Sequence, residues 1–289
     1  MKRKLKEETV IFISVLKWVA LASITGAIVG VSTTVFVKSL NWGASLNLTR
    51  YYYLTIPAGL LISWFIIRYI APRAEGHGAD KVIESVHKGS GRIRPVFVPV
   101  EFIRTFITLT SGASAGKEGP SAQIGAGLAS MLADILRLDG PDRRKLVVCG
   151  ISGGFASVFG TPLAGAIFGI EALFAGSMLY ELLLPSFVAG IISYQVSSWL
   201  GLAYFYRPIA FVPVFSEWFF IKVVFAGVFF GLASFILIET LALCRKAWSW
   251  LRLPAWLKSV AGGAAIALIA YVFSDRYLGL GLDTIQSAL

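Results

Sequence analysis

The chain has 289 residues, of which 56% are hydrophobic and 15% are charged, and its mean hydropathy is +0.75. This composition excludes an ordinary soluble domain, and the lack of an alternating strand pattern disfavours a β-barrel. The net charge of +10 fits the bias of Lys and Arg toward cytoplasmic loops, and no basic stripe with interleaved aromatic residues predicts nucleic-acid binding.

Apolar runs of two lengths alternate along the chain. A helix needs about 20 apolar residues to cross a bilayer, whereas shorter apolar runs are typical of re-entrant or broken helices buried in protein. We therefore predict a multi-pass, all-α membrane protein. The long runs lie near 10–37, 52–71, 179–203, 209–242 and 258–275, and the short runs near 95–112, 119–136, 146–158 and 161–175.

The basic start of the chain predicts a cytoplasmic N-terminal tail over residues 1–8. The apolar run that follows is too long for a cleaved secretory signal, so we expect it to remain as a membrane helix. Gly26 and Gly30 form a GxxxG pair, which predicts close contact with another helix. We expect Lys17 to lie near the end of this helix and to snorkel, and 39–50 to form an outer polar link.

Two glycines, Gly76 and Gly78, flank His77 just before a short predicted helix over 81–86. Two interpretations are open at this point. Either a helix N-terminus faces a ligand here, or the segment is a Gly-rich turn that Asp80 caps, with His77 exposed at its tip. The local sequence by itself favours the turn.

The segment Gly116-Lys117-Glu118-Gly119-Pro120 places a carboxylate between two glycines, ahead of an apolar run rich in small residues. Proline favours the first turn of a helix, and a helix N-terminus offers free N–H groups and a positive dipole end to an anion. Glu118 is therefore predicted to be a tethered anion with which a free anion competes. The alternative is a surface turn, but an ionisable group at membrane depth is functional by default.

Two known motifs match this region only in part, and a third is absent. Residues 112–116 fit the GxSxG nucleophile elbow, but both histidines, His77 and His87, precede Ser114 and none follows it. A phosphate loop needs Ser or Thr where Glu118 stands, and no HExxH zinc motif occurs. We predict that the protein is not an enzyme and uses no metal and no cofactor.

The chain carries signs of an internal repeat. Gly227 and Gly231 form a second GxxxG pair, 201 positions after the first, and Gly279-Leu280-Gly281-Leu282-Asp283 repeats the G-x-G-x-D spacing with an offset of 203. Two features at nearly one offset predict a repeat of about 200 residues, as in many transporters. We expect a first copy over 9–205 and a truncated second copy over 206–289.

The central segment resembles the G-(K/R)-E-G-P motif of the CLC family of chloride channels and chloride/proton antiporters. The flanking residues 121–125 and the segment 160–165 support the resemblance. It implies inverted repeats of tilted, broken and re-entrant helices, and a homodimer in the plasma membrane with one pore per subunit. It also implies chloride transport, as a voltage- or pH-gated channel or as a chloride/proton antiporter, with chloride and protons as the transported partners.

The resemblance also implies roles for individual residues. Glu118 corresponds to the gating glutamate, and the backbone N–H groups around Lys117, Glu118 and Gly119 would bind chloride. The segment 76–80 aligns with the family's G-S-G-I-P motif, so His77, followed by Gly78, stands where a serine contacts the anion.

A pair of glutamates follows the short helix after Pro162 in many antiporters of the family, and here the pair is Glu171-Ala172. In the family the second glutamate of the pair is the inner proton acceptor, and Ala172 stands in its place. Glu171 is the remaining carboxylate and a possible inner carboxylate, with an interfacial or helix-end position as the alternative. The counterpart of Glu118 in the second copy would fall beyond Leu289. The alternative function is therefore a half-length, non-conducting CLC fragment that needs a partner chain.

Overall fold

The computed structural model describes residues 2–45, 52–71, 78–171, 180–204, 216–274, 276 and 278–288. These residues form helices, and no strand occurs among them. The elements are α1 (Lys2–Ser45), η1 (Tyr52–Thr55), α2 (Ile56–Ile70), α3 (Gly78–Lys88), α4 (Phe97–Thr110), α5 (Glu118–Ile135), α6 (Gly140–Phe159), α7 (Pro162–Glu171), α8 (Tyr180–Trp199), α9 (Glu217–Trp250), α10 (Ala255–Val272) and α11 (Leu282–Ala288).

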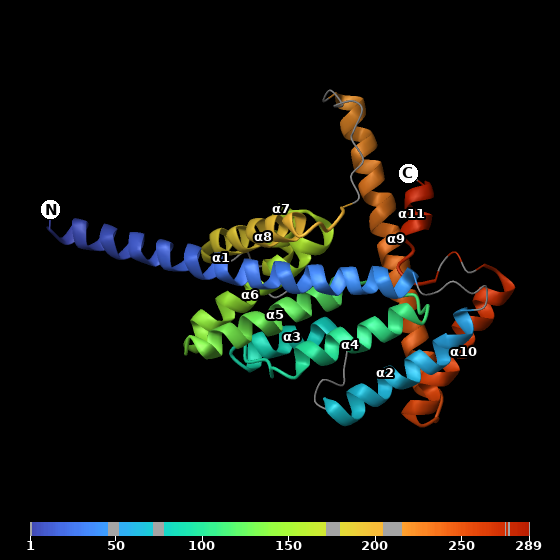
Figure 1. Ribbon diagram of the computed structural model, residues 1–289. Helices are drawn as coiled ribbons and strands as arrows, with labels where there is room; N and C mark the ends of the chain where they lie inside the picture. The colour runs from blue at the N-terminus through green and yellow to red at the C-terminus, as the bar shows by residue number, and fades with distance from the viewer. Residues whose placement is uncertain are drawn as a thin grey trace. The chain divides into compact units, whose positions relative to one another are not determined.

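Five segments are long and apolar enough to cross a membrane, which confirms the predicted number of long runs in the described part of the chain. Their bounds are Ile11–Ser45, Tyr52–Ile70, Tyr180–Trp199, Glu217–Trp250 and Ala255–Val272. The short runs become α4 to α7, and the helix expected over 81–86 becomes the longer α3. The order of a long, a medium and a short helix in α1, α2 and α3 recurs in α9, α10 and α11, as an internal repeat requires (Figure 1).

One segment expected to be a loop is partly helical. The predicted outer link over 39–50 was wrong in its first part, because α1 continues to Ser45. Trp42 stacks on Phe106 of α4 with ring centroids 6.3 Å apart, and Gly43 lets α1 approach the same helix closely. At the start of α6, the Asp139 side chain caps the helix by accepting a hydrogen bond from the Asp142 N–H at 2.9 Å.

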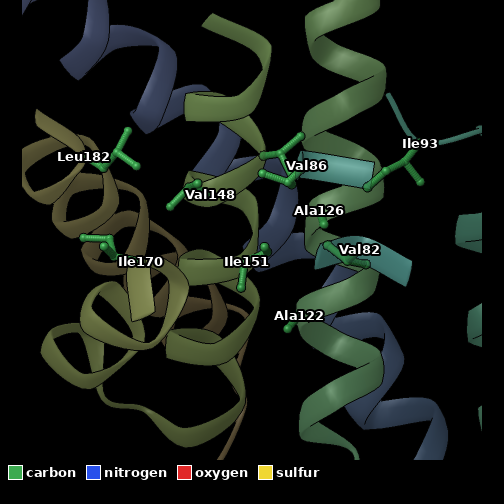
Figure 2. Packing of buried hydrophobic residues seen from close by; sticks show 10 residues of the cluster. Val82, Val86, Ile93, Ala122, Ala126, Val148, Ile151, Ile170 and Leu182 are labelled. Carbon is green, nitrogen blue, oxygen red and sulfur yellow. The ribbon is translucent and has the colours of Figure 1, made fainter. Parts of the chain in front are cut away.

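The chain divides into two compact units, Met1–Tyr204 with Ser259–Leu289, and Phe205–Lys258. In the first unit, α5, α6, α7 and α8 pack with α3 around a common apolar cluster (Figure 2). Val86 of α3 and Ile170 of α7 are fully buried there. The cluster encloses the middle of α5 and so fixes the direction of the helix that starts at Glu118. Its buried members are Val82, Val86, Ile93, Ala122, Ala126, Val147, Val148, Ile151, Ile170 and Leu182.

The GxxxG pair of α1 makes the close contact that its sequence predicts. A Cβ atom added at Gly26 would lie 2.5 Å from the carbonyl oxygen of Ala189 in α8, and one at Gly30 would lie 2.6 Å from that of Ser193. These distances mean that the two backbones touch without intervening side chains. The second pair, Gly227 and Gly231 on α9, lies in the smaller unit and has no heavy atom of that unit within 4 Å of such a Cβ.

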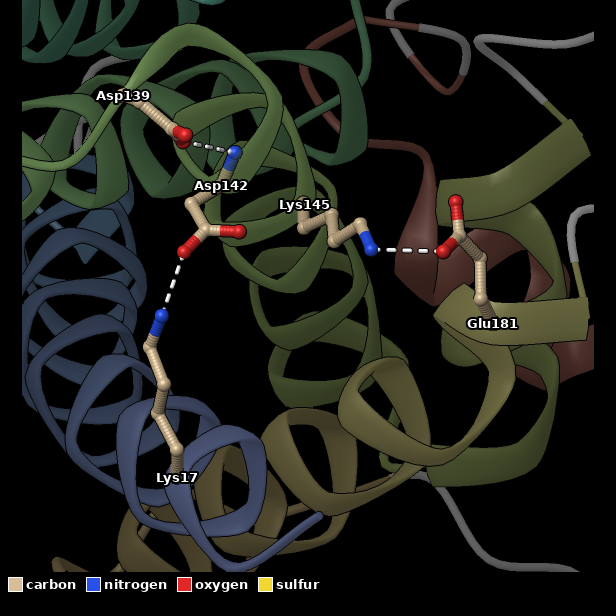
Figure 3. A network of polar contacts seen from close by, with 5 residues as sticks. All are labelled: Lys17, Asp139, Asp142, Lys145 and Glu181. Carbon is tan, nitrogen blue, oxygen red and sulfur yellow. Dashed lines mark hydrogen bonds and ion pairs between the residues drawn. The ribbon is translucent and has the colours of Figure 1, made fainter. Parts of the chain in front are cut away.

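A polar network joins the beginnings of α6 and α8 to α1 (Figure 3). Lys17 forms an ion pair with Asp142 at 2.6 Å, and Lys145 forms one with Glu181 at 2.7 Å. Both ammonium groups lie within 6 Å of the Trp18 ring, at 5.5 and 5.6 Å. Lys17 lies near the start of the membrane-length segment Ile11–Ser45, and its ammonium reaches an acidic partner on α6. That its stem snorkels stays a prediction.

Candidate anion site at the start of α5

Glu118 is the first residue of α5, and its side chain turns back over the residues before the helix. A Cβ atom added at Gly116 would overlap the Glu118 carboxylate oxygen and lie 3.5 Å from its carboxyl carbon. The half-buried carboxylate thus occupies space that only a glycine leaves open. It lies on the side of the helix where free backbone N–H groups and the positive dipole end point.

In the first turn of α5, the Lys117 carbonyl already accepts hydrogen bonds, whereas backbone N–H donors remain available to an anion. The Ser121 hydroxyl donates to the Lys117 carbonyl at 2.8 Å, and the Ser121 N–H donates to the same oxygen at 3.1 Å. The N–H groups of Glu118 and Gly119 belong to the donors that have no partner within a helix, and Pro120 has no N–H. The Lys117 ammonium attracts the Glu118 carboxylate beside these donors.

The start of α5 rests on an unusually close backbone contact with α6. A Cβ atom at Gly125 would overlap the Gly150 carbonyl oxygen, and one at Gly154 would lie 2.5 Å from the Ser121 carbonyl oxygen. The side chains from Ser121 to Gly127 are buried along this contact. Such direct backbone packing holds the N-terminus of α5 rigidly, which a site built from backbone N–H groups needs.

A second loop braces the segment that leads to Glu118. The Gly279 N–H donates to the Gly112 carbonyl at 3.2 Å, and the Ala115 N–H donates to the Gly279 carbonyl at 3.4 Å. Gly112 and Gly279 have φ angles of 96° and 65°, which L side chains rarely adopt. A cavity of about 640 Å³ opens beside this pair, with Tyr52 and Arg276 among its lining residues.

The structure brings only part of the predicted site together. Lys117, Glu118 and Gly119 lie at the start of α5 as expected. His77 lies outside the described residues, and Gly78 is the first residue of α3. Glu171 is the last residue of α7 and is exposed.

Three features of the site were not found from the sequence. These are the overlap that makes Gly116 necessary, the bracing by Gly279, and the buried amide of Gln123. The Gln123 side chain is 4% exposed one turn after Gly119, and its carbonyl oxygen has no hydrogen-bond partner in the described part of the chain. In the sequence, Gln123 is a polar residue within the mostly apolar run after Pro120, and this could have identified it.

Helices of membrane-spanning length mark a multi-pass membrane protein, and the carboxylate folded over a helix N-terminus makes the start of α5 a candidate ion site. Comparison with known proteins gives the family. The family model described as voltage gated chloride channel matches residues 58–289, so the chain belongs to this family, the CLC proteins.

Curated relatives support the same assignment. A chloride/fluoride channel protein of Pseudomonas syringae pv. tomato is 33% identical over 278 residues, which cover 93% of this chain and 61% of that protein. The H(+)/Cl(-) exchange transporter ClcA of Klebsiella pneumoniae is 32% identical over 171 residues, 53% of this chain and 35% of ClcA. The chain therefore spans less than two thirds of the length of these relatives.

Solved structures confirm the CLC-type fold. The crystal structure of a CLC-type fluoride/proton antiporter superposes with a TM-score of 0.88 at 24% identity, covering 96% of this chain and 70% of that chain. A slow cyanobacterial Cl-/H+ antiporter gives a TM-score of 0.74 at 22% identity, with 91% and 65% covered. The all-α CLC-type fold predicted from the sequence is thus confirmed.

Proposed function

We propose that this protein transports halide anions across a membrane and that Glu118 is the gate of the anion path. The observation that carries the proposal is the Glu118 carboxylate lying back over Gly116, in front of the donors of α5. A carboxylate in that place competes with a free anion for the same N–H groups. Protonation of Glu118, or an arriving halide, displaces it and opens the path.

The interaction between the Glu118 carboxylate and the helix dipole sets bounds on the free energy that stabilises the closed state. A carboxylate at a helix N-terminus gains roughly 0.3–2 kcal/mol, depending on its burial. Because Glu118 is half-buried, neutralising it raises the fraction of open gates by roughly two- to thirty-fold. The same protonation makes the flux of the native protein increase as the pH falls.

The transported anion belongs to the halides, with chloride and fluoride as the two candidates that the names of the relatives provide. Within the proposal, His77 donates an N–H to the anion from the segment before α3, and its charge makes selectivity depend on pH. Glu171, exposed at the end of α7, is the inner carboxylate for proton exchange. The working protein is a homodimer in the plasma membrane with a cytoplasmic N-terminus.

Halide efflux from proteoliposomes, recorded with chloride and fluoride electrodes between pH 5 and 8, tests the gate. We expect Glu118→Gln to conduct at a pH-independent, raised rate, whereas Glu217→Gln, an exposed first-turn carboxylate of α9, keeps the native profile. Unchanged pH dependence in Glu118→Gln contradicts the gating role. A His77→Ala variant with native chloride-to-fluoride selectivity would return His77 to the role of a turn residue.

The same vesicles distinguish the transport modes. If a proton gradient drives halide uphill, the protein is an exchanger, and Glu171→Gln is expected to abolish this coupling. If halide moves only down its gradient, the protein is a channel. A chain that yields no halide flux in either direction supports the alternative, a non-conducting fragment that needs a partner chain.

A further inference from the structure

The turn between α9 and α10 concentrates positive charge without any acidic neighbour in the sequence. No Asp or Glu occurs between Glu239 and Asp275, whereas four basic residues do. In the described chain, none of these four side chains forms a hydrogen bond or an ion pair. A cluster of positive charge at the end of an apolar helix attracts anionic partners. The four residues are Arg245, Lys246, Arg252 and Lys258.

A cavity of about 440 Å³ lies within this turn, inside the smaller unit. Arg245 and Trp248 line it from one face of α9, and Lys258 lines it from the first turn of α10. Ser249 also lines it, but its hydroxyl already donates to the Lys246 carbonyl at 2.7 Å. Arg245 and Lys258 are the cationic residues among those that line the cavity, and each can donate hydrogen bonds to an anion.

The surroundings of the cavity have the composition of a membrane–water interface. α9 has a mean hydropathy of 2.4 over its most apolar stretch, and its residues are exposed within the described unit. Three tryptophans, Trp248, Trp250 and Trp256, follow the basic residues around the turn. Tryptophan gathers at the level of lipid headgroups, and an excess of Lys and Arg marks the cytoplasmic side. The turn thus belongs to the cytoplasmic leaflet, where anionic lipids lie.

We propose that this cavity binds the headgroup of an anionic phospholipid, with Arg245 and Lys258 holding its phosphate. The Arg245 guanidinium matches phosphate oxygens with two parallel N–H donors, and the Lys258 ammonium adds a second charge. The Trp248 ring and the aliphatic stems of the two bases provide apolar wall for the first carbons of the acyl chains. A zwitterionic headgroup brings its own ammonium, so phosphatidylglycerol binds here in preference to phosphatidylcholine.

Two double variants separate a defined site from general attraction to a charged surface. Arg245→Gln with Lys258→Gln removes both cavity charges, and Lys246→Gln with Arg252→Gln removes two charges of the same turn that do not line the cavity. Both lose the same net charge. Each is a substitution at a side chain without a described partner, so both variants are expected to fold.

The measurement is the Kd of dioctanoyl phosphatidylglycerol for the purified full chain, from native mass spectrometry, with dioctanoyl phosphatidylcholine and inorganic phosphate in parallel. For the cavity variant we expect a Kd about 30-fold weaker, which corresponds to about 2 kcal/mol for two bases. For the other variant we expect a change below about threefold.

Three outcomes overturn the lipid site. Equal weakening in both variants means diffuse surface attraction, equal affinity for the two lipids removes the anion requirement, and saturation by inorganic phosphate alone means an ion site. Because lipid binding is measured without halide flux, it goes beyond the proposed transport function and fails or stands independently of it.

Discussion

The contact between α5 and α6 gives the sharpest prediction, because a single methyl group tests it. In Gly150→Ala, the new Cβ would overlap the Gly125 carbonyl oxygen and lie 2.7 Å from the Ala129 Cβ and 2.8 Å from the Gly125 carbonyl carbon. Carbon atoms pack at about 3.5–4.0 Å. The two helices would therefore have to separate by about 1 Å.

The cost follows from this overlap. Overpacking of a close contact costs about 1–3 kcal/mol. The same substitution improves helix propensity by about 0.5–1 kcal/mol, since alanine loses less backbone entropy than glycine. Gly227→Ala on α9 is the matched control, because its Cβ would meet no atom within 4 Å inside its own unit. Both variants gain the same helix propensity, so the difference between their free energies of unfolding measures the cost of the overlap alone.

Thermal unfolding of the two variants, followed by tryptophan fluorescence in one detergent, measures this difference. We expect Gly150→Ala to be less stable than Gly227→Ala by about 1–3 kcal/mol, and each kcal/mol lowers the Tm by roughly 2–4 °C for chains of this size. Equal Tm values for the two variants would refute direct backbone packing as the support of the Glu118 site.

Three further predictions concern polar groups, each measured by the same unfolding assay. Glu101 is 2% exposed, and Arg104→Met leaves its carboxylate without the two 2.7 Å hydrogen bonds that Arg104 donates. We expect the free energy of unfolding to fall by about 3 kcal/mol or more. A double variant that also carries Glu101→Leu should recover most of this loss. Asp139→Ala removes the cap on the Asp142 N–H and should cost about 1 kcal/mol, whereas Asp139→Asn should cost little. Lys17→Gln breaks a half-exposed ion pair and should change stability by less than about 1 kcal/mol; a larger loss would assign it a structural role.

The helices that cross the apolar layer could be predicted because their length and hydropathy are local properties. All five long runs appear in the described chain, and the GxxxG pair at Gly26 packs as its spacing predicts. The helix ends were less predictable, because tertiary contacts decide them. α1 continues past residue 37 since Trp42 and Gly43 find Phe106 and its neighbours on α4, a contact that no local pattern contains.

The candidate site shows the same division. Glu118 could be recognised because a carboxylate between glycines at a helix start is unusual chemistry for an apolar region. The resting position of the Glu118 side chain could not be predicted, because it depends on the space that Gly116 leaves open. The bracing of this segment by Gly279 was equally inaccessible, because backbone hydrogen bonds between distant loops leave no trace in residue type beyond the glycines themselves.

The pair of hydrogen bonds between Gly112, Ala115 and Gly279 has a consequence for the order of folding. A ribosome releases the chain from its N-terminus, so residues 112–120 emerge long before Gly279. Contacts between residues far apart in sequence form late because their loop must first close. The stretch before Glu118 therefore acquires its native backbone partners only after α10 has been synthesised. In biogenesis, the segment around Glu118 therefore reaches its final geometry only after Gly279 has emerged.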